Sequence, residues 1–244
     1  MIGIGFSIGD LNIASLEILK KCDYVYLENY TSIYNDTKKL ENLIGKKVVF
    51  ANRQIVESES EEIIDKAKNK NVAFLVIGDV FAATTHVDFY LRALEKTGVK
   101  VLHNISILNA VSDTGLSLYK FGRTASIPFE NANIESPYDV LKQNGNMHTL
   151  FLLDLKDGKT MKFSDAVKYL LDVAGKRKDK AFNANSYCVG CCALGTENAK
   201  IAYGKASELA EVNLDIYPQC LIVVGEMHFM EEEMLKRFIL HQQL

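Results

Sequence analysis

An aspartate directly after an apolar run is the residue of this chain best placed to do chemistry. The apolar residues 74–77 stop at Gly78-Asp79, and residues 84–86 then open a second apolar pattern at helical spacing. This order predicts a buried strand, a turn and a helix start. In open α/β sheets, ligands bind beyond the carboxyl ends of the strands. Asp79 is therefore a candidate binding residue, and the alternative is that its carboxylate only hydrogen-bonds its own turn.

A second pattern, Gly3-x-Gly5-x-x-x-Gly9, falls where the first strand turns into a helix, and Glu28 ends the next strand. This spacing is similar to a dinucleotide-binding fingerprint, in which glycines admit a pyrophosphate and the acid holds a ribose. A nicotinamide-dependent oxidoreductase is therefore an alternative function. The plainer interpretation is that the turn needs glycines for its tight geometry. Few residues precede Gly3, which makes an anchored pyrophosphate turn less favourable.

Cysteine and histidine do not form a metal pattern. Cys188-x-x-Cys191-Cys192 has no second CxxC to complete four zinc ligands, and it lies in an apolar run typical of a buried strand. We expect these thiols to pack as small hydrophobic groups and predict no bound metal. The histidines show no ligand spacing to one another: His86, His103, His148, His228 and His241. Nucleophile-elbow and P-loop motifs are also missing, so no catalytic residue is assigned.

Composition excludes several classes of protein. The chain has 244 residues and a net charge of −3 with mixed signs, unlike a nucleic-acid binder with a basic face. No apolar run approaches the roughly 20 residues of a membrane span, and the start lacks a secretory pattern. An odd number of cysteines, 5, favours free thiols in a reducing, cytoplasmic compartment.

The first hundred residues alternate strand and helix patterns with short links, which predicts a parallel sheet. Strands are expected at 1–6, 23–27, 47–50, 72–77 and 99–102, and helices at 12–21, 37–44, 58–69, 84–96 and 106–115. Asp10 or Asn12 is a candidate helix cap, and Gly45 is a typical helix end.

The second half is less regular. Strands are expected at 125–129, 149–155, 187–193, 201–203 and 220–224, and helices at 137–143, 163–174, 207–211 and 229–240. Glycines at 115 and 122, and the loss of a clear hydrophobic period between them, mark the boundary between the two halves of the chain. We predict an N-terminal α/β domain over residues 1–115 and a C-terminal α/β domain over residues 116–244.

Several short blocks occur in a familiar order. They are Gly3-Ile4-Gly5-Phe6, Lys21-Cys22-Asp23, Tyr30-Thr31-Ser32, Val76-Ile77-Gly78-Asp79, Ala83-Thr84-Thr85-His86, His103-Asn104-x-Ser106-Ile107, Gly115-Leu116-x-Leu118-Tyr119-x-Phe121-Gly122, His148-Thr149-Leu150 and Gly225-x-x-His228. In this order the chain resembles the diphthine synthases, a branch of the tetrapyrrole-methylase-like methyltransferases, over nearly its whole length. The Tyr-Thr-Ser, Ala-Thr-Thr-His and His-Asn-x-Ser-Ile blocks separate it from relatives that act on porphyrin precursors.

The resemblance implies a methyltransferase that uses S-adenosylmethionine (SAM) and releases S-adenosylhomocysteine. Its substrate would be translation elongation factor 2, at a histidine that carries a 3-amino-3-carboxypropyl group. The amino group would be methylated repeatedly, and eukaryotic members also esterify the carboxylate. The number of methyl groups is not evident from the sequence. The family fold implies a parallel-sheet N-terminal domain, a mixed-sheet C-terminal domain, SAM in the interdomain cleft, and a homodimer.

The resemblance also implies cofactor contacts, mostly through the backbone. They are Phe6, Asp79, Ala82, Ser106, Ile107, Leu153, Leu194 and Gln219. The chain departs from the family pattern at four positions near these contacts: Val80 replaces a proline, Ala82 a glycine, Ile105 an alanine and Gln219 a histidine. Methyl transfer from a sulfonium depends mainly on positioning, so no catalytic base is named.

Overall fold

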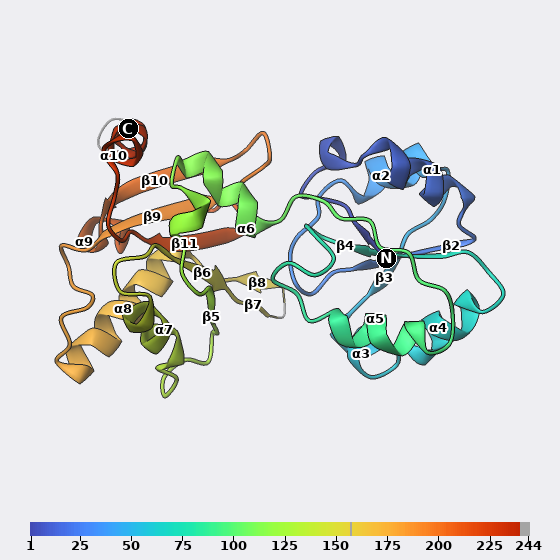
Figure 1. The fold of residues 1–244 in the computed structure, drawn as a ribbon, viewed down its shortest axis with the longest axis horizontal. Helices are drawn as coiled ribbons and strands as arrows, with labels where there is room; N and C mark the ends of the chain where they lie inside the picture. Colours follow the sequence, from blue (N-terminus) through green and yellow to red (C-terminus); the bar gives the residue numbers. More distant parts are fainter. Residues whose placement is uncertain (157, 240–244) are drawn as a thin grey trace. The chain divides into compact units, whose positions relative to one another are not determined.

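The computed structural model describes residues 1–156 and 158–239. It divides into two compact units, Met1–Ala110 and a second that begins at Val111. The boundary expected from the sequence, between residues 115 and 116, falls slightly later in the chain. Each unit contains its own sheet (Figure 1).

Unit 1, residues 1–110, is built on a parallel sheet. Its strands are β1 (Ile2–Gly3), β2 (Tyr24–Glu28), β3 (Val49–Ala51) and β4 (Val72–Val76), in the order β1-β4-β2-β3. All the pairings are parallel, as the alternating pattern predicts. The strand expected at 99–102 is reduced to a parallel bridge between Ile2 and Leu102 beside β1. The carboxyl ends of β1 and β4 and the segment after Leu102 therefore meet at one edge.

Helices cover both faces of this sheet (Figure 1). One face packs on α1 (Ile13–Lys21) and α2 (Thr37–Ile44), and the other on α3 (Arg53–Glu57), α4 (Glu61–Ala67) and α5 (Val87–Leu94). Along β4, Ala73 and Leu75 enter the first core, and Phe74 and Val76 enter the second. This alternation is the period of two of a strand that is buried on both faces.

Local signals explain where these helices begin and end. Asn12 caps α1 by accepting a hydrogen bond from the Ser15 N–H, and Gly45 ends α2 in the left-handed conformation. Two expected helices differ. The region 58–69 contains only α4, Glu61–Ala67, and a helix that the pattern did not predict, α3, precedes it and is capped by Asn52 through the Ile55 N–H. The region 106–115 forms α6 (Ile107–Ala110) and a 3-10 turn, Val111–Thr114.

Unit 2 is built on a mixed sheet. Its strands are β5 (Ala125–Ile127), β6 (Thr149–Leu153), β9 (Tyr187–Cys192), β10 (Lys200–Lys205) and β11 (Gln219–Val223), in the order β10-β9-β11-β6-β5. The β5–β6 pairing is parallel, and the others are antiparallel. A short hairpin, β7 (Leu155–Lys156) and β8 (Lys159–Thr160), follows β6.

The helices of unit 2 agree closely with the sequence pattern. They are α7 (Ser136–Asn144), α8 (Phe163–Arg177), α9 (Ala206–Leu209) and α10 (Phe229–Leu235). A 3-10 turn, Lys236–Phe238, continues α10. The last residue of the helix expected at 229–240, and His241, lie outside the described residues.

The cysteines are free and buried, as expected for small hydrophobic groups. Cys188, Cys191 and Cys192 lie within β9, and burial raises the pKa of the Cys192 thiol to about 12. Within residues 1–156 and 158–239, no cluster of three or more His, Cys, Asp or Glu side chains could hold a metal ion. No helix in those same ranges is both long and apolar enough to cross a bilayer.

Candidate functional site

Three loop segments of unit 1 are joined by backbone hydrogen bonds beyond the ends of their strands. Gly5 and Gly78 bond reciprocally, with N–O distances of 3.1 and 2.9 Å. The Gly3 N–H donates to the Leu102 carbonyl at 2.8 Å. The turn after β1, the corner after β4 and the segment after residue 102 thus form one connected site, as the carboxyl ends of parallel strands predict.

Two glycines are required where these segments approach each other. A Cβ atom on Gly3 would lie 2.7 Å from the Gly78 carbonyl oxygen, too close for any side chain. Gly78 itself has φ of +82°, which favours glycine. A Cβ there would face the Phe6 ring at 3.6 Å and the Ser106 Cα at 3.8 Å. Phe6, Gly78 and Ser106 therefore converge on one point, and the glycines serve this close packing.

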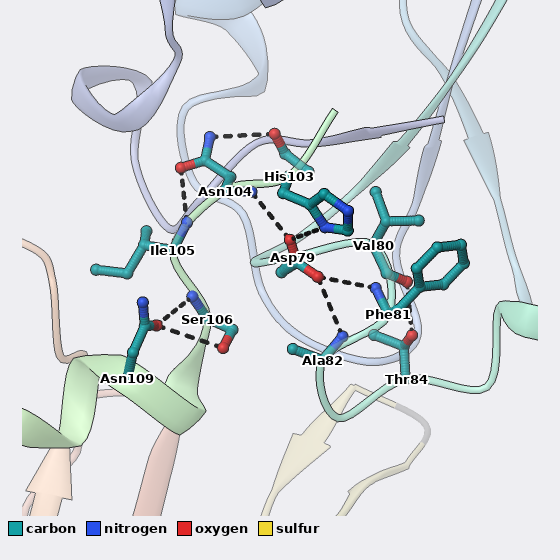
Figure 2. Close-up of polar contacts among 11 residues, drawn as sticks. Asp79, Val80, Phe81, Ala82, Thr84, His103, Asn104, Ile105, Ser106 and Asn109 are labelled. Carbon is teal, nitrogen blue, oxygen red and sulfur yellow. Dashed lines mark hydrogen bonds and ion pairs between the residues drawn. The ribbon is translucent and has the colours of Figure 1, made fainter. Parts of the chain in front are cut away.

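Asp79 is the hub of the site (Figure 2). One carboxylate oxygen accepts hydrogen bonds from the N–H groups of Phe81, at 3.0 Å, and Ala82, at 3.3 Å. The other oxygen accepts from the Asn104 N–H at 3.0 Å and contacts His103 Nδ1 at 2.9 Å. Burial alone would raise the pKa of Asp79, but these hydrogen bonds and His103 hold it below its usual value.

The side chain of Asp79 is therefore saturated by partners within unit 1. It is only 7% exposed, and both oxygens already accept two contacts each. The sequence offered two interpretations of Asp79, as a binding residue or as a residue that hydrogen-bonds its own turn. The carboxylate does hydrogen-bond its own turn, and these bonds set the shape of the loop that contains Ala82. Any effect of Asp79 on a ligand would act through that loop and through residues 103–104.

Two residues that the sequence reasoning did not assign to the site, Asn104 and Asp10, hold it together. Asn104 donates from its side-chain amide to the carbonyls of Gly3, at 3.1 Å, and Asp10, at 2.9 Å. Asp10 in turn accepts from the Phe6 N–H at 2.8 Å and from the Ser7 N–H at 2.9 Å. Asn104 lies inside the His103-Asn104-x-Ser106 block, which is the one sequence signal that pointed to it.

Ser106 and Ile107 open the short helix α6 at the same edge. The Ser106 N–H donates to Asn109 Oδ1 at 2.8 Å, and the Ile105 N–H donates to Asn104 Oδ1 at 2.8 Å (Figure 2). Ser106 is buried, while Ile107 is half-buried. The first turn of the helix is thereby fixed relative to the Gly78–Asp79 corner.

The loop that follows Asp79 is tightly constrained. Val80 is fully buried in the second core of unit 1, and the Thr84 hydroxyl donates to its carbonyl at 2.7 Å. Ala83, next to Ala82, has φ of +59°, a left-handed conformation that alanine rarely adopts. Strain of this kind persists only where surrounding contacts impose it, and it gathers at functional sites.

Unit 2 brings its three expected residues to one edge of its own sheet. Leu153 ends β6, Gln219 begins β11, and Leu194 lies two residues beyond the end of β9. Gln219 pairs with Cys192 across the β11–β9 ladder. The residue before Leu194, Ala193, has φ of +46° and donates its N–H to the Pro218 carbonyl at 2.7 Å. A strained alanine thus adjoins an expected contact in each unit.

The Gln219 side chain is hydrogen-bonded within unit 2. Its Oε1 accepts from the Phe163 N–H at 2.9 Å, and its Nε2 donates to the carbonyls of Leu214, at 2.7 Å, and Ile216, at 3.0 Å. The Gln219 side chain therefore supports the start of α8 and is not available for another role.

The oxidoreductase alternative depends on Glu28, whose carboxylate is also occupied by hydrogen bonds within unit 1. It is fully buried, and burial raises its pKa. One oxygen accepts from the Thr31 hydroxyl and the Ile77 N–H, and the other from the N–H groups of Tyr30 and Thr31. A ribose would have to displace these bonds. This geometry favours the plainer interpretation of both Glu28 and the glycine turn.

Comparison with known proteins agrees with this arrangement. Residues 1–210 match the family model described as Tetrapyrrole (Corrin/Porphyrin) Methylases. A diphthine synthase of Methanococcus aeolicus is 39% identical over 93% of this chain and 92% of its own length. A diphthine methyl ester synthase of Schizosaccharomyces pombe is 39% identical over 98% of this chain and 93% of its own.

Solved structures give the same result. The crystal structure of a provisionally named diphthine synthase of Entamoeba histolytica superposes with a TM-score of 0.88 at 35% identity. The match covers 98% of this chain and 97% of that one. The parallel-sheet and mixed-sheet units, the converging loop ends of unit 1 and these full-length similarities lead to one assignment. The chain belongs to the tetrapyrrole (corrin/porphyrin) methylase family, and within it to the diphthine synthases.

Proposed function

We propose that this chain is a SAM-dependent methyltransferase of diphthamide biosynthesis. Its substrate is the histidine of translation elongation factor 2 that carries a 3-amino-3-carboxypropyl group. The observation that carries the proposal is the similarity to curated diphthine synthases over nearly the full length of both chains. We also propose that the reaction takes place in the cytoplasm and that the enzyme is a homodimer; the resemblance to the family supports both proposals.

The loop ends of unit 1 fit an adenosyl cofactor in one specific respect. Glycines at 3 and 78 let three backbone segments approach closely, and the Asp79 carboxylate fixes the loop that contains Ala82 by accepting from the N–H groups of Phe81 and Ala82. Phe6, Asp79, Ala82, Ser106 and Ile107 would hold SAM in this unit.

Leu153, Leu194 and Gln219 of unit 2 would supply further contacts, with residue 219 acting through its backbone. SAM supplies an activated methyl group when bound. What the protein must provide is a fixed position for the amine, since alignment of reacting groups gives much of the rate in such displacements. That the cofactor lies between the two domains stays a prediction.

Two products fit the proposal, diphthine and diphthine methyl ester. The relatives named above include a diphthine synthase and a diphthine methyl ester synthase. The two names distinguish methylation of the amino group from additional esterification of the carboxylate. This chain is similar to both at 39% identity, so the degree of methylation has to be measured.

The test is methyl transfer to the factor. Elongation factor 2 that carries the 3-amino-3-carboxypropyl histidine would be incubated with this protein and labelled SAM, and the modified peptide analysed by mass spectrometry. We expect label on that histidine and none on factor that lacks the precursor group. A protein whose melting temperature rises with NAD but not with SAM would reject the proposal, because a ligand that binds the folded state stabilises it by mass action.

A further inference from the structure

His103 is the one side chain at the unit 1 site that is both oriented by a carboxylate and open to solvent. Its Nδ1 lies 2.9 Å from Asp79 Oδ2, while its side chain is 65% exposed. The same Asp79 oxygen accepts from the Asn104 N–H, so it is fixed in place from a second direction. Among the described residues, no hydrogen bond engages His103 Nε2.

The contact with Asp79 determines which ring nitrogen is basic. Asp79 has a lowered pKa and is ionised at neutral pH, so it can only accept. Nδ1 must therefore carry the hydrogen that points to Asp79, which leaves Nε2 of the neutral ring as a lone-pair acceptor. The Phe81 ring packs edge-on against the imidazole, with centroids 6.1 Å apart.

The location of this imidazole suits a role in the reaction. His103 directly follows the Leu102 bridge beside β1 and precedes Asn104, which ties the Phe6 turn to the site. Figure 2 shows His103 beside Asp79 on the segment that leads to Ser106. An amine that is to be methylated must first lose a proton, since an ammonium nitrogen has no electron pair to donate.

We propose that His103, oriented by Asp79, is the general base that takes the proton from the substrate amine before each methyl transfer. This inference rests on the proposed function. The ammonium proton passes to His103 Nε2, which becomes an imidazolium stabilised by the Asp79 carboxylate. The freed nitrogen electron pair forms the bond to the methyl carbon, and the carbon–sulfur pair leaves with the sulfur, which becomes a neutral thioether. The imidazolium then returns the proton to water.

The charges around His103 are few. Asp79, at the end of β4, is the charged side chain in contact with the ring. Asp10 is turned away, toward the N–H groups of Phe6 and Ser7. Phe81 is uncharged and shields the ring on the side of Tyr90, with which it packs. Asp79 is therefore the charged group that orients the imidazole.

The decisive variant is His103→Asn. The asparagine amide nitrogen occupies the place of Nδ1, so it can still donate to Asp79, but nothing remains that can accept a proton. We expect kcat at neutral pH to fall about 100-fold or more, the usual contribution of general-base catalysis. The SAM dissociation constant, measured by calorimetry, should stay within about twofold of wild type, on the scale where tenfold is about 1.4 kcal/mol.

A pH profile separates this role from a structural one. Above the pKa of the free amine, expected between about 8 and 10, the substrate is already deprotonated. The deficit of His103→Asn should therefore shrink at least tenfold between about pH 7 and pH 9.5. A merely structural loss would remain constant with pH. In parallel, added imidazole should restore activity to His103→Ala at this exposed position.

Two failures are distinguishable. Wild-type protein that transfers no methyl group to the precursor-bearing factor would reject the proposed function. Wild-type protein that does transfer, beside a folded His103→Asn variant with an unchanged rate across the pH range, would overturn the assignment of His103. If His103→Asn does not fold, the imidazole titration of His103→Ala decides, and a lack of rescue overturns the assignment.

Discussion

The contacts of Asp79 allow the effect of removing its carboxylate to be worked out in detail. In Asp79→Ala, the N–H groups of Phe81 and Asn104 each lose a bond of 3.0 Å, and the Ala82 N–H loses a longer one of 3.3 Å. A hydrogen bond to a charged group contributes about 1.5–3 kcal/mol. The Phe81 and Ala82 groups are half-buried, so water recovers part of the loss. We expect the free energy of unfolding to fall by about 3 kcal/mol.

The same substitution releases the loop that holds Ala82. Ala83 keeps its left-handed φ of +59° only while its surroundings impose it. Without the carboxylate, we expect that loop to relax and SAM to bind at least tenfold more weakly, which corresponds to about 1.4 kcal/mol. Calorimetric titration of SAM into the folded variant measures this change, and denaturant unfolding measures the loss of stability separately.

Asp79→Asn is the matched control. Its remaining carbonyl oxygen can still accept from Phe81 and Ala82, while its amide group cannot accept from the Asn104 N–H. Its losses in stability and in SAM affinity should therefore lie between those of wild type and Asp79→Ala. An unchanged SAM dissociation constant in folded Asp79→Ala would refute the argument that the carboxylate shapes the cofactor loop.

Two further predictions concern unit 2. Buried Glu231 accepts from Lys120 Nζ at 2.6 Å and from backbone N–H groups; burial alone would raise its pKa, but these partners hold the pKa well below the ordinary value. Its stabilising contribution is therefore present above about pH 4 and is lost as the pH falls further. Glu231→Gln should lower the free energy of unfolding by about 3 kcal/mol at pH 7, with a smaller deficit in acid, as urea titrations at both pH values would reveal. Gly190→Ala places a Cβ 2.7 Å from the Phe163 ring and should cost about 1–3 kcal/mol in thermal or denaturant unfolding, whereas Gly175→Ala, which meets open space, should cost nothing.

Much of the fold could be predicted because its signals are local. The bounds of α2, Thr37–Ile44, follow from an amphipathic pattern and the glycine after it, and α1 follows from its Asn12 cap. The parallel sheet of unit 1 follows from alternating elements with short links. The helix expected at 58–69 is shortened to α4, Glu61–Ala67, and the five-residue α3 before it was not predicted, because its start depends on the Asn52 cap and it is too short to show a periodicity.

The sequence by itself determined the order of strands and helices, and it singled out the Gly78–Asp79 corner, because strand ends are visible in the pattern of apolar residues. Only the tertiary structure decided what those side chains do. Asp79 meets Asn104 across 25 positions, Glu28 meets Ile77 across 49, and Asn104 meets Asp10 across 94. Such hydrogen bonds depend on how distant segments come together, and no spacing along the chain encodes them. For that reason His103 looked like an isolated histidine in the sequence, and the fold makes it the partner of Asp79.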